Sequence, residues 1–138
     1  MQYKFISNYF HNTTSRISAL LFSFSFLIFI QISYSQTVTK FAGTYGTFGF
    51  IGDGGPSTAA ELNEPLQLAT DLNGNVYIAD QTNNRIRSIN ACGVISTFAG
   101  KNTGGYNGDG IPATAAKLAV PCGVAVDKER RLVYITDV

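Results

Sequence analysis

The feature that most constrains this chain is an internal repeat. Short stretches occur twice in the same order, and the two copies begin at positions 41 and 98, a separation of 57 residues. The separation is 56 residues between positions 53 and 109, and 57 again between positions 80 and 137. Length changes confined to turns are typical of a structural unit that stacks on copies of itself. The repeated stretches are Phe-Ala-Gly (41–43 and 98–100), Gly-Asp-Gly (52–54 and 108–110), Thr-Ala-Ala (58–60 and 114–116) and the pentapeptides at 76–80 and 133–137.

The first 35 residues have the pattern of a secretory leader. Lys4 and Arg16 precede an apolar run over positions 17–30, and Ser33-Tyr34-Ser35 supplies small residues for cleavage after Ser35. That run is shorter than the ~20 residues that span a bilayer. The sequence therefore predicts a signal peptide at 1–35 and a secreted protein. An uncleaved signal anchor is the alternative, and it would leave residues 36–138 membrane-anchored but still outside the cytosol.

Charge and histidine content exclude some classes of function for the remaining chain. Without Lys4 and Arg16, 8 of the 10 basic residues remain against 9 acidic ones, a net charge of −1. This balance offers no surface for a polyanion, so nucleic acid is not an expected partner. The only histidine, His11, lies in the leader. Catalysis by a Ser-His or Cys-His pair and an imidazole-based zinc site are therefore not expected.

Strands and turns, rather than helices, are predicted after position 36. Four short strands are expected at 66–71, 76–80, 85–90 and 94–98, joined by links of three or four residues rich in Asn and Gly. Links of this kind form hairpins, so the four strands are expected to form an antiparallel meander. A further strand is predicted over 37–41, the counterpart of 94–98.

A long glycine-rich loop precedes each meander, at 44–64 and again at 101–120. Its Thr-Ala-Ala segment is predicted to form a single helical turn, with Ser57 or Thr58 placed to cap the first copy.

A four-stranded meander has two faces to bury. Repetition at 57 residues lets such units stack face to face as the blades of an all-β propeller. The residues themselves resemble NHL repeats, a family that builds β-propellers, although Asn83-Asn84-Arg85 stands where that family has Asn-His-Leu. The stretches that carry the resemblance are Phe-Ala-Gly, Gly-Asp-Gly-x-Pro-x-Thr-Ala-Ala-x-Leu, Gly123-Val124-Ala125-Val126-Asp127, Asn75-Val76-Tyr77-Ile78-Ala79-Asp80 and Asn83-Asn84-Arg85-Ile86-Arg87.

When they are aligned with the blades of this family, residues 36–138 divide into three parts. They are an outer strand (36–43), one full blade (44–100) and a partial blade (101–138). One and a half blades do not close a ring, so we interpret the chain as a propeller fragment that needs further blades or copies.

Four aspartates recur at equivalent positions, and a structural role is predicted for each. They are Asp53 and Asp109 in the loops, and Asp80 and Asp137 at the strand ends. The alternative for Asp53 and Asp109 is a cation site built from carboxylate oxygens. Residues serving every repeat are expected to support the repeat, so no catalytic, cofactor or metal residue is assigned. The segment 71–75 is predicted to be a hairpin turn rather than a calcium loop.

The predicted meander implies one side-chain pair and argues against another. Asp80 and Arg85 flank a four-residue turn and are predicted to form an ion pair across it. Cys92 lies in a link between strands, whereas Cys122 opens a strand, so the two belong to opposite rims of the blades. A strand length of ~15 Å exceeds disulfide geometry, and no Cys92–Cys122 bond is predicted.

The favoured function is a secreted binding or scaffold module whose rim loops contact protein or glycan. Exposed aromatic residues on loops suit recognition; the residues proposed for contact are Tyr45, Phe48, Phe50 and Tyr106. Packing of these aromatics on the propeller rim is the alternative for the residues. For the protein, the alternatives are the N-terminal fragment of a propeller enzyme of lyase or lactonase type, as the resemblance allows, and a non-functional truncation.

Overall fold

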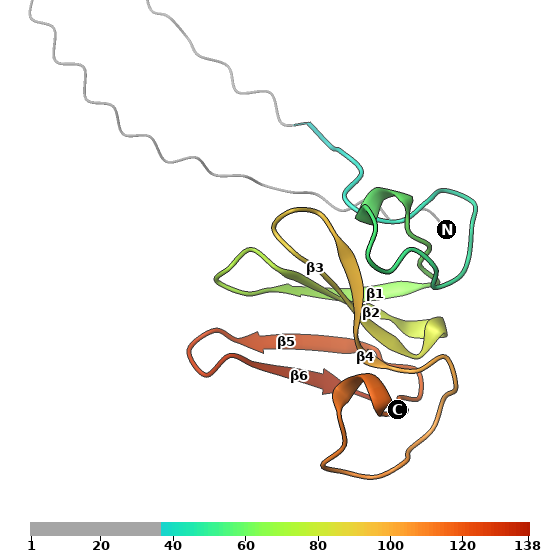
Figure 1. The fold of residues 1–138 in the computed structure, drawn as a ribbon, viewed down its shortest axis with the longest axis vertical. Coiled ribbons are helices and arrows are strands. Elements are labelled where there is room, and N and C mark those ends of the chain that lie inside the picture. The colour runs from blue at the N-terminus through green and yellow to red at the C-terminus, as the bar shows by residue number, and fades with distance from the viewer. Residues whose placement is uncertain (1–36) are drawn as a thin grey trace, which may run out of the picture.

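The computed structural model describes residues 37–138, which form six strands and three single-turn 3-10 helices (Figure 1). The predicted signal peptide and its cleavage after Ser35 lie outside the described residues. The elements are η1 (Ser57–Ala59), β1 (Pro65–Thr70), β2 (Val76–Asp80), η2 (Gln81–Asn83), β3 (Arg85–Ile89), β4 (Ile95–Gly100), η3 (Ala113–Ala115), β5 (Gly123–Asp127) and β6 (Leu132–Thr136).

The predicted meander is confirmed. Strands β1 to β4 form one antiparallel sheet in sequence order, and β5 and β6 form a two-stranded sheet. The β1–β2 link is the predicted hairpin turn. Asp71 Oδ1 accepts hydrogen bonds from the backbone N–H groups of Asn73 and Asn75, both at 2.9 Å. Gly74 adopts a φ of +81°, which only glycine adopts without strain.

The two sheets stack face to face, as neighbouring blades of a β-propeller do (Figure 1). The core between them joins one face of the first blade to β5 and β6. Its buried members are Ala79, Ile86, Ala99 and Val124. On the opposite face of the first blade, the long loop supplies Ala60 and Leu62 to a second core with Ile78, Ile89 and Ile95. Each face of the complete blade is therefore covered.

Two local predictions are wrong. Residues 37–43 form no strand, because within residues 37–138 no strand lies beside them to complete a hydrogen-bonded ladder. The Thr-Ala-Ala segments do form helical turns, but neither Ser57 nor Thr58 caps η1. Ser57 Oγ instead donates a hydrogen bond to the Phe41 carbonyl at 2.7 Å, which ties the N-terminal segment to the loop.

Candidate binding loops and their arginine anchor

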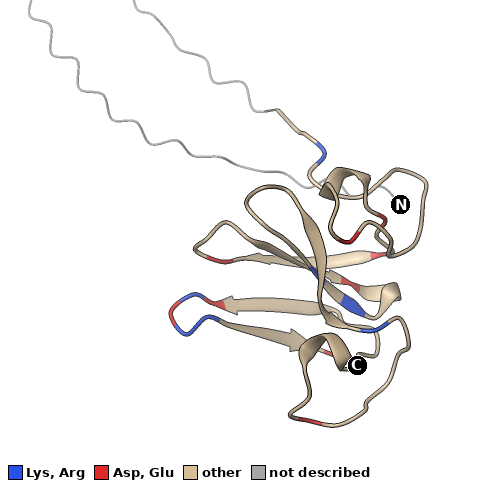
Figure 2. Cartoon of the chain, in the orientation of Figure 1, with Lys and Arg blue, Asp and Glu red and all other residues tan. Residues whose placement is uncertain are grey.

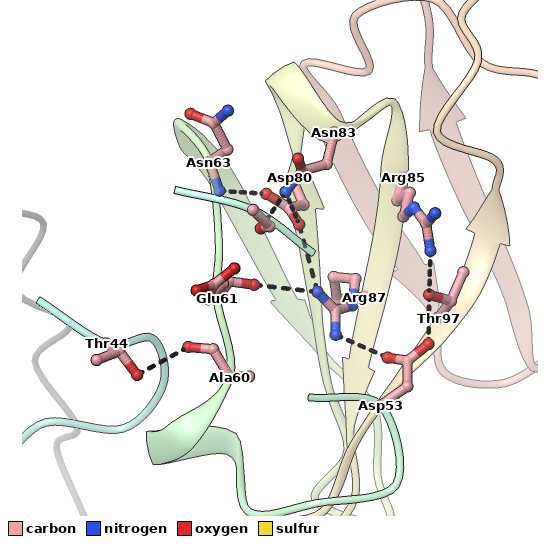
Figure 3. Close-up of polar contacts among 11 residues, drawn as sticks. Thr44, Asp53, Ala60, Glu61, Asn63, Asp80, Asn83, Arg85, Arg87 and Thr97 are labelled. Carbon is pink, nitrogen blue, oxygen red and sulfur yellow. Dashed lines mark hydrogen bonds and ion pairs between the residues drawn. The ribbon is translucent and has the colours of Figure 1, made fainter. Parts of the chain in front are cut away.

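The long loop of the first blade is anchored by Arg87, whose side chain is wholly buried. Arg87 lies in the middle of β3 and points toward the loop (Figure 3). Its Nη2 donates to Asp53 Oδ1 at 2.7 Å, and its Nη1 donates to the Glu61 carbonyl at 3.2 Å. Asp80 Oδ2 lies 3.5 Å from Nη1. One guanidinium thus holds the loop at two points and contacts the end of β2.

The strand register explains this arrangement and corrects the predicted Asp80–Arg85 pair. Asp80 is the cross-strand partner of Arg85, and Arg87 lies two residues further along the same face. Arg85 instead donates to Thr97 Oγ1 at 3.1 Å and stacks on the Phe50 ring, 4.1 Å from its centroid. Asp80 consequently pairs with Arg87 rather than with Arg85.

The two carboxylates on Arg87 differ in environment. Asp80 is fully buried, and this burial raises its pKa despite hydrogen bonds from the Asn63 N–H and the Asn83 side chain and the nearby Arg87 charge. Burial also opposes ionisation of Asp53, whose side chain is 44% exposed. There the hydrogen bond from Thr97 and the Arg87 charge outweigh it and lower the pKa. The Asp53 carboxylate is therefore stabilised in its charged form.

The recurring aspartates have partly equivalent contacts. Asp80 Oδ1 accepts the Asn63 N–H at 2.7 Å, and Asp137 accepts the Ala119 N–H at 2.8 Å, at the same repeat position. Asp53 joins its loop to β3 and β4 through Arg87 and Thr97. Asp109 is exposed and has no hydrogen-bond partner within residues 37–138.

The four proposed contact aromatics fall into two groups. Tyr45, Phe48 and Tyr106 are 82%, 71% and 75% exposed, whereas Phe50 is half-buried against Arg85. The loops that carry these aromatics lie at the same end of the sheets (Figure 1).

Tyr45 lies in a tight turn and Phe48 follows that turn, in a segment that is fixed at both ends. Thr47 Oγ1 donates to the Thr44 carbonyl at 3.3 Å, and Thr44 Oγ1 donates to the Ala60 carbonyl at 3.2 Å. The Asn83 side chain donates to the Gly49 carbonyl. The two exposed rings are therefore presented by a loop whose backbone is held in place.

A groove at the opposite end of the sheets was not predicted. It has a volume of about 550 Å³ and lies between the β1–β2 and β5–β6 turns. Asp71, Tyr77, Asp127, Lys128 and Arg131 are among its lining residues. Figure 2 shows charges of both signs on the β5–β6 turn. The position of this groove could have been predicted from the repeat, because the β1–β2 and β5–β6 turns are equivalent turns of stacked blades and such turns lie side by side.

Other chemistry-bearing residues are dispersed. Within residues 37–138, no group of three or more His, Cys, Asp or Glu side chains is arranged to hold a metal ion. Cys92 and Cys122 are free thiols, the first exposed and the second half-buried. In the same range, no helix has the length and apolar character needed to cross a membrane.

Comparison with known proteins agrees with this architecture. The family model described as "Teneurin NHL domain" matches residues 49–107, which cover most of the first loop, strands β1 to β4 and the first residues of the second loop. Residues 49–107 of this chain are therefore similar to an NHL-repeat domain. The predicted resemblance and the propeller-type all-β fold are thereby confirmed.

Curated relatives and solved structures extend this NHL-repeat assignment. Teneurin-1 of Homo sapiens is 34% identical over 91 residues, covering 62% of this chain and 3% of its own length. Teneurin-3 of Danio rerio is 45% identical over 51 residues, covering 37% and 2%. This chain thus spans only 2–3% of the length of these relatives.

Two solved structures from Bacteroides thetaiotaomicron are similar in fold. An auxiliary nutrient binding protein has a TM-score of 0.58 at 26% identity, covering 74% of this chain and 27% of its own. A protein of unknown function has a TM-score of 0.63 at 22% identity, covering 74% and 25%.

Proposed function

We propose that this NHL-repeat chain is part of a secreted binding module that contacts protein or glycan through the 44–49 loop. The observation that carries the proposal is the pair of exposed rings of Tyr45 and Phe48 on a turn pinned at both ends. Aromatic rings contribute large contact areas at low entropic cost, and a fixed loop lowers the ordering cost of binding.

The residues next to the two rings in the sequence are uncharged, and the nearest carboxylate, that of Glu61, lies against Gly49. Thr44, Gly46, Thr47 and Gly49 separate and flank the two aromatics, and none of these residues carries a charge. The resemblance in fold to a protein described as an auxiliary nutrient binding protein supports a binding role. Secretion is inferred from the leader pattern over 1–35.

A glycan microarray and intact cells, with and without glycosidase treatment, test the proposal. The full chain, produced by a secretory host, is compared with the double variant Y45A/F48A. We expect binding to weaken about tenfold or more when both rings are removed, because aromatic anchors commonly dominate interface energy. Loss of cell binding after glycosidase treatment would identify the ligand as glycan, and persistence would identify it as protein.

The matched control is L72A. Leu72 is 74% exposed in the β1–β2 turn, at the opposite end of the sheet. We expect L72A to bind as the unmodified chain does. Equal binding by Y45A/F48A and the unmodified chain would contradict the proposal, as would a loss confined to L72A.

A further inference from the structure

The turn between β3 and β4 has the side-chain spacing of an acceptor for N-linked glycan. Enzymatic N-glycosylation modifies an asparagine when the residue two positions later is serine or threonine and the residue between them is not proline. Asn90-Ala91-Cys92 has this spacing, with a thiol in place of the hydroxyl. Among the asparagines of residues 37–138, only Asn90 is followed at this spacing by a hydroxyl or thiol side chain.

The Asn90 side chain uses only one of its two polar atoms within the fold. Its Oδ1 accepts hydrogen bonds from the backbone N–H groups of Cys92 and Val94, both at 3.0 Å. Its Nδ2, the atom that carries the sugar in an N-linked glycan, donates to no group within residues 37–138. Asn90 is exposed. The amide is therefore oriented through its oxygen, and its nitrogen is free for modification.

The thiol that completes the tripeptide is also accessible. Cys92 is exposed, and it forms no disulfide within the described part of the chain. The Sγ of cysteine occupies the place of the Oγ of serine, and it donates and accepts hydrogen bonds more weakly than a hydroxyl does. Ala91 is exposed as well. All three residues of the tripeptide therefore lie on the surface, and the third supplies a weakened form of the group that the acceptor requires.

The position of the turn leaves room for a bulky group. Ile89 is the cross-strand partner of Val76, so the β3–β4 turn lies at the same end of the sheet as the β1–β2 turn. This end is opposite the 44–49 loop (Figure 1). The turn joins the two strands that are farthest from β1 in the sheet. A glycan in this turn would therefore extend from the blade without covering the exposed rings of the loop.

We propose that Asn90 is an N-glycosylation site whose acceptor motif is completed by the Cys92 thiol. In the reaction, Nδ2 attacks the anomeric carbon of an oligosaccharide carried on a lipid pyrophosphate. A carbon–nitrogen bond forms, the bond from that carbon to the pyrophosphate oxygen breaks, Nδ2 loses one proton, and the lipid pyrophosphate leaves with the bonding electrons. Oδ1 keeps its lone pairs, so the folded turn retains its two hydrogen bonds after modification.

The transferase and the lipid-linked donor belong to the secretory pathway of eukaryotic cells. The leader pattern over 1–35 would direct the chain into that pathway. This leader is the one premise that the glycosylation site shares with the proposed binding function, because the contacts of Asn90 do not involve the 44–49 loop.

Expression of the full chain in a eukaryotic secretory host tests the site. Chain from the cells and from the medium is treated with peptide-N-glycosidase in heavy-oxygen water and then analysed by peptide mass spectrometry. The glycosidase converts a glycosylated asparagine to an aspartate that carries one heavy oxygen. We expect this label at Asn90 in a fraction of the molecules, since the thiol is a weaker hydrogen-bonding group than a hydroxyl.

Three variants separate the chemistry of the motif from the structure of the turn. N90D removes Nδ2 but keeps an oxygen that accepts from the Cys92 and Val94 N–H groups, so we expect a folded chain without glycan. C92A removes the thiol, and we expect it to abolish the label. C92S supplies a hydroxyl at the same position, and we expect it to raise the glycosylated fraction severalfold. A merely structural role of Cys92 would not make this fraction follow the hydrogen-bonding strength of the side chain.

Two outcomes would overturn the proposal. The first is an unlabelled Asn90 in both fractions of the unmodified chain; glycan on C92S alone would then show that the turn is accessible but that the thiol does not serve. The second is equal labelling of the unmodified chain and C92A, which would show that modification does not depend on the thiol. N90D is expected to bind as the unmodified chain does in the glycan microarray, so a failure of this proposal and a failure of the proposed binding function are distinguishable.

Discussion

Arg87→Gln is expected to destabilise the first blade by about 3 kcal/mol. Removing one member of a buried ion pair costs roughly 3–5 kcal/mol, because the other charge stays buried without compensation. Asp80, which is fully buried, would be that charge. The lower end of the range applies, because Asn63 and Asn83 still donate to Asp80 and the 44% exposed Asp53 can be hydrated.

A loss of this size is a large fraction of the roughly 5–15 kcal/mol that stabilises a typical domain. Urea unfolding of the full chain, followed by circular dichroism and tyrosine fluorescence, measures it. The double variant R87Q/D80N is the control, since it removes the stranded charge and retains an amide that accepts hydrogen bonds. We expect the double variant to recover part of the lost stability.

The dependence on pH distinguishes this cause from a general packing defect. Burial raises the pKa of Asp80 in the folded state, and removal of the Arg87 charge raises it further. A raised folded pKa makes the folded state bind protons more readily, so stability rises as the pH falls through that pKa toward the unfolded value of 3.8. The deficit of R87Q should therefore shrink in acid. A deficit that is independent of pH, or is unchanged by D80N, would refute the reasoning.

Two further predictions use the same unfolding assay. The lowered pKa of Asp53 means that its ionised form stabilises the fold above pH 3.8, and that this contribution is lost as the pH falls through the folded pKa. Because the carboxylate is partly exposed, D53N should lower the free energy of unfolding by about 0.5–1 kcal/mol at pH 7 and by little below the folded pKa. A loss of stability that persists in strong acid would contradict this prediction. Gly100 (φ +89°) and Gly93 (φ +79°) both adopt left-handed conformations, but a Cβ at Gly100 would also collide with the Asn84 carbonyl, whereas a Cβ at Gly93 would meet open space. The substitution G93A should therefore lower the free energy of unfolding by about 1 kcal/mol, and G100A by about 3 kcal/mol. Equal losses would show that the collision at Gly100 is relieved by movement of the chain.

Much of the blade could be predicted from the sequence because its determinants are local. Links such as Asp71 to Asn75 specify hairpins through glycine and asparagine conformations, and a hairpin brings neighbouring strands into register. Repetition at 56–57 residues then indicates that units stack. The predicted outer strand over 37–41 differs because a strand depends on a partner ladder, which lies outside its own residues.

In the candidate site, too, local features could be predicted from the sequence and contacts between distant residues could not. Composition and loop position pointed to exposed aromatics, and Tyr45, Phe48 and Tyr106 are exposed, but the stacking of Phe50 on Arg85 could not be predicted. The Asp80–Arg85 pair was inferred from closeness in sequence. Arg85 is diverted by Phe50 and Thr97, which lie 35 residues before and 12 residues after it.

The sequence alone therefore determined the strands, the turns and their repetition, since these depend on residues within a few positions of one another. Only the tertiary structure decided that Arg87 anchors the loop, since Asp53 lies 34 residues away and Glu61 lies 26 residues away. Such contacts depend on which face of a strand meets which loop, and a pattern of neighbouring residues does not specify that meeting.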